Sequence, residues 1–365
     1  MSEQLKESLV DYDPATGRMR STPQQIFIET SSRCNLTCVH CPKDFGSDHG
    51  HPQLDLPLET INRLGPWLAA ARFVNLNMVG EPMVSPHFER IVELCGAGDA
   101  EVSFNSNGLL LNDARCQLLI EQKVSSIAVS IDGTDSMVPI RGVPHTAVID
   151  RLEKLDQWKR RLGSEVPHIA LAYVMMRRNA LELPKLLRQV LPRVRLHAIH
   201  IQPLVIYYET LRGENIYDCE VANDAVEEAR EVAEQHGVLF SVFRSSSSED
   251  ERFEEKAHDE GLGQLGQHSD RFGCVDPFYE IKVRSTGEIM ACSYGQMPGF
   301  QIHEMELDDI WNHEWYRDLR RRLYSKEFSG ACEGCPYIHG CSSNQLDALR
   351  PGIHHSEEER FFRDV

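Results

Sequence analysis

Three cysteines lie close together near the start of the chain, at Cys34, Cys38 and Cys41. Their spacing, C-x3-C-x2-C, lets three thiols bind one face of the same cubane iron–sulfur cluster. Such a cluster contains four irons and is normally held by four thiolates, so three local cysteines leave one iron open to a substrate or a second cofactor. A structural zinc knuckle and three buried thiols are the alternative interpretations.

A second set of cysteines lies near the C-terminus. Cys274 and Cys292 are followed, after a gap, by Cys332, Cys335 and Cys341 in the pattern C-x2-C-x5-C. Eleven cysteines in a chain without a secretion signal favour metal ligands or reactive thiols over disulfides. A second metal centre is therefore expected here, with zinc as the alternative to iron and sulfur.

Short polar motifs follow several of the apolar runs between these two sets. They are Gly80-Glu81-Pro82, Asn105-Ser106-Asn107-Gly108, Ser130-Ile131-Asp132-Gly133 and Arg141-Gly142. Each motif alone is also what an ordinary turn contains. Because the carboxyl ends of parallel strands meet at one edge of a sheet, their order after Cys34 predicts one shared site.

The segments that must position these motifs alternate between apolar and amphipathic runs. The predicted strands are 25–30, 73–78, 101–105, 126–131, 169–175, 198–203 and 238–243, and the predicted helices are 58–71, 88–95, 114–123, 148–162, 183–194 and 224–236. This alternation predicts a parallel sheet with helices on its outer face, an α/β fold. Cys34 directly follows the first strand, where sites in such folds form.

The pattern changes after residue 243. A polar, serine-rich and charged stretch predicts a linker over 244–272. A hairpin with strands at 278–283 and 289–293 is expected next, followed by an amphipathic helix over 308–326. The predicted organisation is an N-terminal segment (1–23), an α/β domain (24–243), the linker and a C-terminal domain (273–365).

Composition excludes some classes of function. The 365 residues include 38 Lys and Arg against 56 Asp and Glu, a net charge of −18. So acidic a chain repels phosphate backbones, so nucleic acid is not an expected partner. No apolar run is long enough for a membrane span, and the polar N-terminus lacks the apolar core of a signal peptide. A cytoplasmic location is expected.

The cysteine spacing and the motifs after it resemble those of the radical S-adenosylmethionine (SAM) enzymes. In that family three cysteines hold a [4Fe–4S] cluster, and its open iron binds the amino and carboxylate groups of SAM. An electron from the reduced cluster then cleaves SAM to methionine and a 5′-deoxyadenosyl radical. The resemblance implies a partial (β/α)6 TIM-like barrel. Many members have an aromatic residue just before the third cysteine, where this chain has His40.

The resemblance also implies which residues line SAM. Gly80, Glu81 and Pro82 match the element that holds the SAM amino group, and the acceptors of this element suit a buried ammonium. Two further elements line the ribose and carboxylate and correspond to Asn105, Ser106 and Asn107 and to Ser130 and Asp132. The guanidinium of Arg141 is predicted to pair with the SAM carboxylate, with an ordinary surface arginine as the alternative.

The second cysteine set resembles the SPASM or twitch extension of the same family, which binds auxiliary [4Fe–4S] clusters. A full SPASM domain has seven cysteines for two clusters, whereas this chain has five, so one auxiliary cluster is expected and two are the alternative. The preferred ligands are Cys274, Cys292, Cys332 and Cys335. Cys341 is then spare, or it replaces one of the last pair.

Further residues are candidates for acting on the substrate. Cys219, in a loop after the sixth strand, and Cys341 are candidate hydrogen-atom donors, with an unreactive loop thiol as the alternative for Cys219. Tyr208 and Tyr294 are expected to face the substrate. Cys95 and Cys116 fall on apolar helix faces and are expected in the core. None of these roles follows from spacing alone.

The implied reaction is hydrogen abstraction from carbon, giving oxidation or epimerisation. Only 33 residues precede Cys34, fewer than a leader-peptide recognition domain needs, which favours a small sugar, aminocyclitol or nucleoside-like substrate in natural-product biosynthesis. A flavodoxin or ferredoxin-type electron donor is the expected partner. The alternatives are a peptide- or protein-modifying maturase, a radical decarboxylase of a sugar acid, and a non-enzymatic iron–sulfur or zinc protein.

Overall fold

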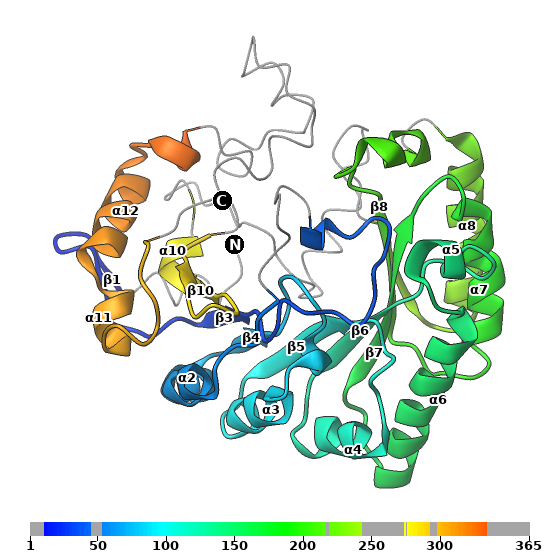
Figure 1. The fold of residues 1–365 in the computed structure, drawn as a ribbon, viewed down its shortest axis with the longest axis horizontal. Helices are drawn as coiled ribbons and strands as arrows, with labels where there is room; N and C mark the ends of the chain where they lie inside the picture. Colours follow the sequence, from blue (N-terminus) through cyan, green and yellow to red (C-terminus); the bar gives the residue numbers. More distant parts are fainter. Residues whose placement is uncertain are drawn as a thin grey trace.

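One curved sheet forms the centre of the molecule. The computed structural model describes residues 11–44, 53–216, 219–242, 274, 276–292 and 298–333. Within these ranges nine strands form a sheet in the order β11-β10-β3-β4-β5-β6-β7-β8-β9, and β1 and β2 form a separate hairpin. Figure 1 shows the sheet curving with helices along its outer side. This is the partial barrel with a C-terminal extension that the sequence predicts.

The barrel contains seven parallel strands and the helices between them. The strands are β3 (Gln25–Ile28), β4 (Phe73–Asn75), β5 (Glu101–Ser106), β6 (Ser126–Ser130), β7 (His168–Met175), β8 (Ala198–Pro203) and β9 (Leu239–Val242). The helices are α2 (Leu58–Ala70), α3 (Phe88–Gly96), α4 (Asp113–Glu121), the short α5 (Met137–Arg141), α6 (His145–Leu162), α7 (Leu183–Val190) and α8 (Glu220–Gln235). The predicted strands and long barrel helices are therefore confirmed, with ends that differ by a few residues.

Alternating burial shows that the two faces of the barrel strands have different surroundings. In β6, Ile127 and Val129 are fully buried in the hydrophobic core, whereas Ser126, Ala128 and Ser130 on the other face are only half-buried. Burying an isoleucine or valine side chain contributes roughly 1.5–3 kcal/mol. The face with the large apolar side chains therefore packs against the helices and leaves small side chains on the face that surrounds the interior.

The C-terminal hairpin belongs to the same sheet as the barrel. Strand β10 (Glu280–Val283) pairs in parallel with β3, and β11 (Ile289–Met290) pairs antiparallel with β10. A short helix, α10 (Asp276–Tyr279), precedes them. The buried carboxylate of Glu29, just past β3, accepts hydrogen bonds from Ser285 N (2.8 Å) and Ser285 Oγ (2.6 Å). The predicted hairpin is present, although Phe278 and Tyr279 of its predicted first strand lie in α10. Its pairing with the first barrel strand does not follow from the sequence pattern.

The helix predicted over 308–326 is two helices, so the prediction of a continuous helix was wrong. Helix α11 (Leu307–Trp311) ends before Asn312, and α12 (Glu314–Ser325) begins after His313. The side chain of Asn312 pairs with Met19 N (2.9 Å) and Met19 O (3.1 Å), and His313 Nδ1 accepts a hydrogen bond from Trp315 N. These contacts end one helix and cap the next.

An N-terminal hairpin packs against these helices. Strands β1 (Tyr12–Asp13) and β2 (Arg18–Met19) are antiparallel, and Arg317 Nε donates to Thr16 O at 2.8 Å. The ring nitrogen of Trp311 donates to Ser21 O at 3.0 Å. The segment predicted to precede the barrel is thus bound to the C-terminal helices. The predicted linker over 244–272 lies outside the described residues.

No described helix has both the length and the apolar composition that crossing a membrane requires.

Candidate active site

The loop that carries Cys34, Cys38 and Cys41 leaves the carboxyl end of β3, and all three thiols are half-buried and free of disulfides. Cys41 N donates to Cys38 O at 3.1 Å. The pKa of Cys34 is raised and that of Cys38 is raised to about 11, mainly by burial, and the charge of Cys41 contributes to both increases. The three thiols are therefore close enough to interact electrostatically, as ligands of one cluster must be.

Nitrogen donors surround two of these sulfur atoms. Cys34 Sγ accepts from Leu36 N (3.4 Å) and from Asn107 Nδ2 (3.9 Å), and Cys38 Sγ accepts from Arg141 Nη1 (3.7 Å). Hydrogen bonds of this kind stabilise thiolates and tune a bound iron–sulfur cluster. A metal deprotonates its thiol ligands, so the raised pKa values do not prevent binding. The donor set therefore fits an iron–sulfur cluster.

Gly80, after β4, lies directly against the backbone that leads to Cys34. Its φ is +83°, and a Cβ atom there would lie 2.2 Å from Ser31 O and 2.7 Å from Arg33 O. The next residue, Glu81, donates its backbone N–H to Arg33 O at 2.8 Å. Glycine is required here both for the left-handed backbone and for the close approach. The turn at Gly80 thus packs against the backbone that precedes Cys34 and holds it in place.

The buried carboxylate of Glu81 joins the ends of β4 and β5. Its Oε1 accepts from Ser106 Oγ (2.8 Å) and Met83 N (3.3 Å), and its Oε2 accepts from Asn107 N (2.8 Å). Burial raises the pKa of Glu81, and these hydrogen bonds oppose the rise. Pro82 O accepts from Thr30 Oγ1 at 3.1 Å. Glu81 therefore positions the β5 end.

Asn107 extends this connection to the cysteine loop. Besides its contact with Cys34, its Nδ2 donates to Asn35 Oδ1 at 2.8 Å. Two other predicted SAM-lining residues, Asn105 and Ser130, lie at strand ends with exposed or half-buried side chains. The predicted clustering around the cysteine loop is observed for Gly80, Glu81 and Asn107, while direct contact of the predicted residues with SAM stays a prediction.

Asp132 and Arg141 form a buried ion pair beside Cys38. Asp132 Oδ2 accepts from Arg141 Nε at 2.5 Å, and Asp132 Oδ1 accepts from Val174 N at 2.7 Å. Burial acts to lower the pKa of Arg141, but Asp132 and the cysteine thiolates outweigh it and raise that pKa overall. The guanidinium is therefore charged and directed at both Asp132 and Cys38. Its predicted pairing with the SAM carboxylate is not tested by these contacts.

His40, which lies between Cys38 and Cys41 in the sequence, is close to the same Asp132 carboxylate. Its Nε2 is 3.7 Å from Asp132 Oδ2, and burial lowers the pKa of His40 to about 4 although the carboxylate opposes this. The ring is therefore neutral at pH 7. The backbone N–H of Val39 donates to Ile140 O at 3.0 Å, which joins the loop to α5.

Residues that sequence patterns did not single out complete the site. Asn179 is fully buried, and its Nδ2 donates to Asp132 O at 3.0 Å. Glu182 accepts from Thr134 N (2.6 Å) and Ser136 Oγ (2.6 Å), which fixes the loop after β6. Both follow β7 in a stretch with no distinctive motif, so only their three-dimensional contacts reveal them.

Tyr208 contacts the cysteine loop, and its predicted position facing the substrate stays a prediction. Its hydroxyl donates to Cys41 O at 2.9 Å. Cys219 lies at the N-cap of α8 and packs against the hydrophobic core, and a hydrogen-donor role for it stays a prediction. Cys95 and Cys116 are fully buried in the core, as predicted. The structure thus assigns Tyr208 a positioning contact.

Three of the five C-terminal cysteines are described. Cys274 is half-buried next to α10, Cys292 is half-buried just after β11, and Cys332 is buried in a 3-10 turn after α12. Burial lowers the pKa of Lys282. The negative charges of Asp276, Cys292 and Cys274 act in the opposite direction, so both thiols lie within electrostatic range of this lysine. Cys335, Cys341 and Tyr294 lie outside the described residues.

Among the described side chains, no three His, Cys, Asp or Glu converge closely enough to hold a single metal ion.

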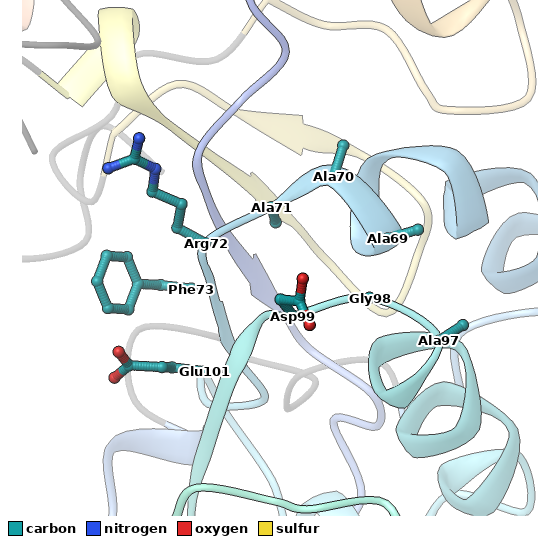
Figure 2. Close-up of a pocket in the computed structure, with 9 residues that line it drawn as sticks. All are labelled: Ala69, Ala70, Ala71, Arg72, Phe73, Ala97, Gly98, Asp99 and Glu101. Carbon is teal, nitrogen blue, oxygen red and sulfur yellow. The ribbon is translucent and has the colours of Figure 1, made fainter.

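A surface pocket lies at the opposite end of the sheet. Figure 2 shows it between the ends of α2 and α3 and the first residues of β4 and β5, lined by Ala71, Arg72, Gly98, Asp99 and Glu101 among others. Sites in parallel α/β folds form at the carboxyl ends of strands, whereas this pocket lies at the amino ends. It is therefore separate from the cysteine site.

Two separate regions of the chain match known family models. A family model described as the radical SAM superfamily matches residues 28–189, and a model described as an iron–sulfur cluster-binding domain, SPASM, matches residues 274–336.

Individual relatives are distant. A tungsten-containing aldehyde ferredoxin oxidoreductase cofactor-modifying protein of Pyrococcus furiosus is 27% identical over 46% of this chain, and the match spans only 48% of that protein. A mycofactocin maturase of Mycobacterium tuberculosis is 23% identical, with 88% of this chain and 77% of the maturase covered. The crystal structure of Streptococcus suis SuiB bound to its precursor peptide SuiA superposes with a TM-score of 0.59 at 14% identity, covering 87% of this chain and 70% of SuiB.

Proposed function

The chain joins a radical SAM domain (28–189) to an SPASM domain (274–336), and we propose that it uses them to oxidise a carbon of a peptide substrate. SAM and a [4Fe–4S] cluster are the cofactors of the first domain, and the second binds iron–sulfur clusters. The observation that carries the radical SAM part of the proposal is that Glu81, Asn107 and Arg141, which follow β4, β5 and β6 in the chain, all contact the loop of Cys34, Cys38 and Cys41.

The residues of this chain divide the work between ligation and positioning. Cys34, Cys38 and Cys41 are the proposed ligands of the first cluster. Asn107 and Arg141 donate to two of the thiolates, which stabilises their charge. When bound, the first cluster would supply the electron that cleaves SAM to methionine and the 5′-deoxyadenosyl radical. After that radical takes a hydrogen atom from the substrate, an auxiliary cluster would accept one electron as the substrate releases a proton.

Three further contacts hold the loop in place. Gly80 and Glu81 bind its backbone at Arg33, and Tyr208 binds it at Cys41. These contacts come from segments that follow two different strands, β4 and β8, so separate parts of the barrel hold the loop. Preorganisation of this kind keeps reacting groups in position without a cost at the moment of reaction.

For the C-terminal domain we retain one auxiliary cluster with Cys274, Cys292, Cys332 and Cys335 as ligands. The thiolates of Cys274 and Cys292 both act to raise the pKa of Lys282, which supports a position of the two cysteines close to each other. The C-terminal hairpin joins the barrel sheet through β10 and β3, so the second centre is attached directly to the first strand of the barrel. A flavodoxin or ferredoxin-type protein is the proposed electron donor.

Two of the similarities favour a peptide substrate. One relative that matches 88% of the chain is a mycofactocin maturase, and the similar fold of SuiB was solved with a precursor peptide bound. The comparisons do not confirm the small sugar-like substrate expected from the sequence, epimerisation or a role in natural-product biosynthesis. We therefore place peptide modification first.

Deuterium transfer tests this proposal. The reconstituted, reduced protein is incubated with SAM and either a fully deuterated tryptic peptide mixture or a mixture of deuterated sugars and aminocyclitols. Deuterium in 5′-deoxyadenosine from the peptides alone is the expected result. Deuterium from the sugars alone would overturn the substrate proposal, and 5′-deoxyadenosine without deuterium in either arm would exclude both substrate mixtures.

A further inference from the structure

Arg320 is a completely buried arginine beside the second set of cysteines. It lies in α12 and is 0% exposed. Its Nε donates to Pro277 O at 2.7 Å, and Pro277 belongs to α10, three residues after Cys274. Its Nη1 and Nη2 atoms are buried and have no hydrogen-bond partner among the described residues. The guanidinium is thus held by one nitrogen while two others remain without a partner in this part of the chain.

Two aromatic rings cover the guanidinium. Its central carbon lies 4.2 Å from the ring centre of Trp311 and 5.2 Å from that of Tyr316. Tyr316 is fully buried, and its hydroxyl also has no hydrogen-bond partner among the described residues. The rings stabilise the cation and fix its orientation. They do not supply the acceptors that the Nη atoms require.

Arg320 remains charged at neutral pH. Burial lowers its pKa to about 9, and Tyr316 and Tyr12 oppose this. A buried charge is costly unless a partner compensates it. An uncompensated guanidinium in the described part of the fold therefore points to an anionic partner that the chain binds or places there.

Lys282 provides an internal comparison. It is the other buried cation near Cys274 and Cys292, and it lies 4.5 Å from the ring centre of Phe27. Its ammonium is in direct contact with the carboxylate of Glu280. The charge of Lys282 is therefore compensated within the described structure.

The neighbours of Arg320 connect it to the proposed cluster ligands. Through Pro277 it contacts the helix that follows Cys274. Burial raises the pKa of Tyr316, Arg320 acts to lower it, and the thiolate of Cys292 acts to raise it. Cys292 therefore lies within electrostatic range of Tyr316. Cys332 is buried in the same hydrophobic core as Trp311 and Tyr316.

We propose that Arg320 directs its guanidinium at the auxiliary iron–sulfur cluster, compensates the negative charge of that cluster and raises its reduction potential. The inference rests on the proposed ligands Cys274, Cys292 and Cys332. Four thiolates outweigh the positive charge of a cubane core, and reduction adds a further electron, so a nearby fixed cation stabilises the reduced state. Net charge and hydrogen bonds to sulfur are known determinants of cluster potential.

A redox titration tests the proposal apart from catalysis. Replacing Cys34, Cys38 and Cys41 by Ala removes the first cluster, so the EPR signal of the reduced full-length protein reports on the auxiliary cluster alone. In that background Arg320→Met and Arg320→Gln are expected to shift the midpoint potential to lower values, and Arg320→Lys is expected to stay near the parent. Arg321→Met is the matched control, because Arg321 is in the same helix but half-exposed and paired with Glu314.

Each outcome decides the proposal. An unchanged potential in the two neutral variants, with iron and sulfide content intact, would overturn it, as would an equal shift in Arg321→Met. A loss of folding stability without a change in potential would show that Arg320 compensates a protein carboxylate instead. If neither neutral variant retains the cluster, retention by Arg320→Lys supports charge compensation, and loss in all three variants would overturn it. The shift in midpoint potential does not depend on deuterium transfer by the parent protein. Failure of the Arg320 proposal can therefore be distinguished from failure of the proposed peptide oxidation.

Discussion

Replacing Gly80 by alanine is expected to remove the first cluster. The backbone of Gly80 is left-handed at φ +83°, which costs a residue with a Cβ atom about 1–2 kcal/mol. The added Cβ would lie 2.2 Å from Ser31 O, and ordinary contact begins at 3.4 Å, so the two segments must separate by about 1.2 Å. Overpacking of this kind costs a further ~1–3 kcal/mol. The total is about 2–5 kcal/mol.

A matched control separates the two contributions. Gly163, after α6, has φ +65° and no atom within 4 Å of a built Cβ. Gly163→Ala therefore carries the backbone cost of about 1–2 kcal/mol without the clash. In denaturant unfolding of the two apo-proteins, the free energy of unfolding of Gly80→Ala should be about 1–3 kcal/mol lower than that of Gly163→Ala.

Iron content gives the functional result of the same substitution. Two cubane clusters contain about 8 irons, and Gly80→Ala should retain about 4, from the auxiliary cluster, because the displaced backbone leads directly into Cys34. Gly163→Ala should retain all of them. A Gly80→Ala protein as stable as Gly163→Ala and with full iron content would refute the assignment of Gly80 as the support of the cysteine loop.

Three further substitutions test the contacts around the loop. Glu81→Gln places an amide NH2 where an oxygen now accepts from the β5 end, so denaturant unfolding should show a loss of ~1–3 kcal/mol; a neutral effect would contradict the positioning role. Asp132→Asn leaves the buried guanidinium of Arg141 without its counter-charge, with an expected loss of ~3–5 kcal/mol; a loss no larger than that of a surface Asp→Asn change would refute the ion pair. Tyr208→Phe removes one hydrogen bond to Cys41 O, worth ~1 kcal/mol, and the first cluster should bleach faster in air; equal bleaching rates would argue against this contact.

Local patterns predicted the parts of the fold that depend on neighbouring residues. The short run of Ile127, Ala128 and Val129 between two serines identifies β6 without tertiary information. Motifs at strand ends were placed together because parallel strands share a carboxyl edge, and Glu81 and Asn107 do meet there. Cysteine spacing likewise identified both iron–sulfur regions, which the family matches confirm.

Contacts between distant segments were not predictable in this way. The pairing of β10 with β3 joins residues more than 250 positions apart, and no local pattern in Ile281 encodes its partner. Asn312 ends α11 through a hydrogen bond to Met19, so an amphipathic run that continues in sequence is interrupted in the fold. Tyr208 and Glu182 were likewise unrecognisable as positioning residues, since their partners lie on other loops.

The substrate was the least predictable feature. Its expected class depends on analogy and not on any residue that contacts a substrate, and the comparisons do not confirm it. The proposed reaction type depends on the cysteine loop and the strand ends, whereas substrate choice depends on side chains that differ between proteins sharing one fold.

The central claim is that Cys34, Cys38 and Cys41 hold the cluster that cleaves SAM. The most direct measurement is the release of 5′-deoxyadenosine by the reconstituted protein with SAM and dithionite. Release is expected from the parent and from Cys95→Ala, whose thiol is buried in the core away from the loop, and no release is expected from Cys38→Ala. Equal release from Cys38→Ala, or none from a parent that contains both clusters, would contradict the account.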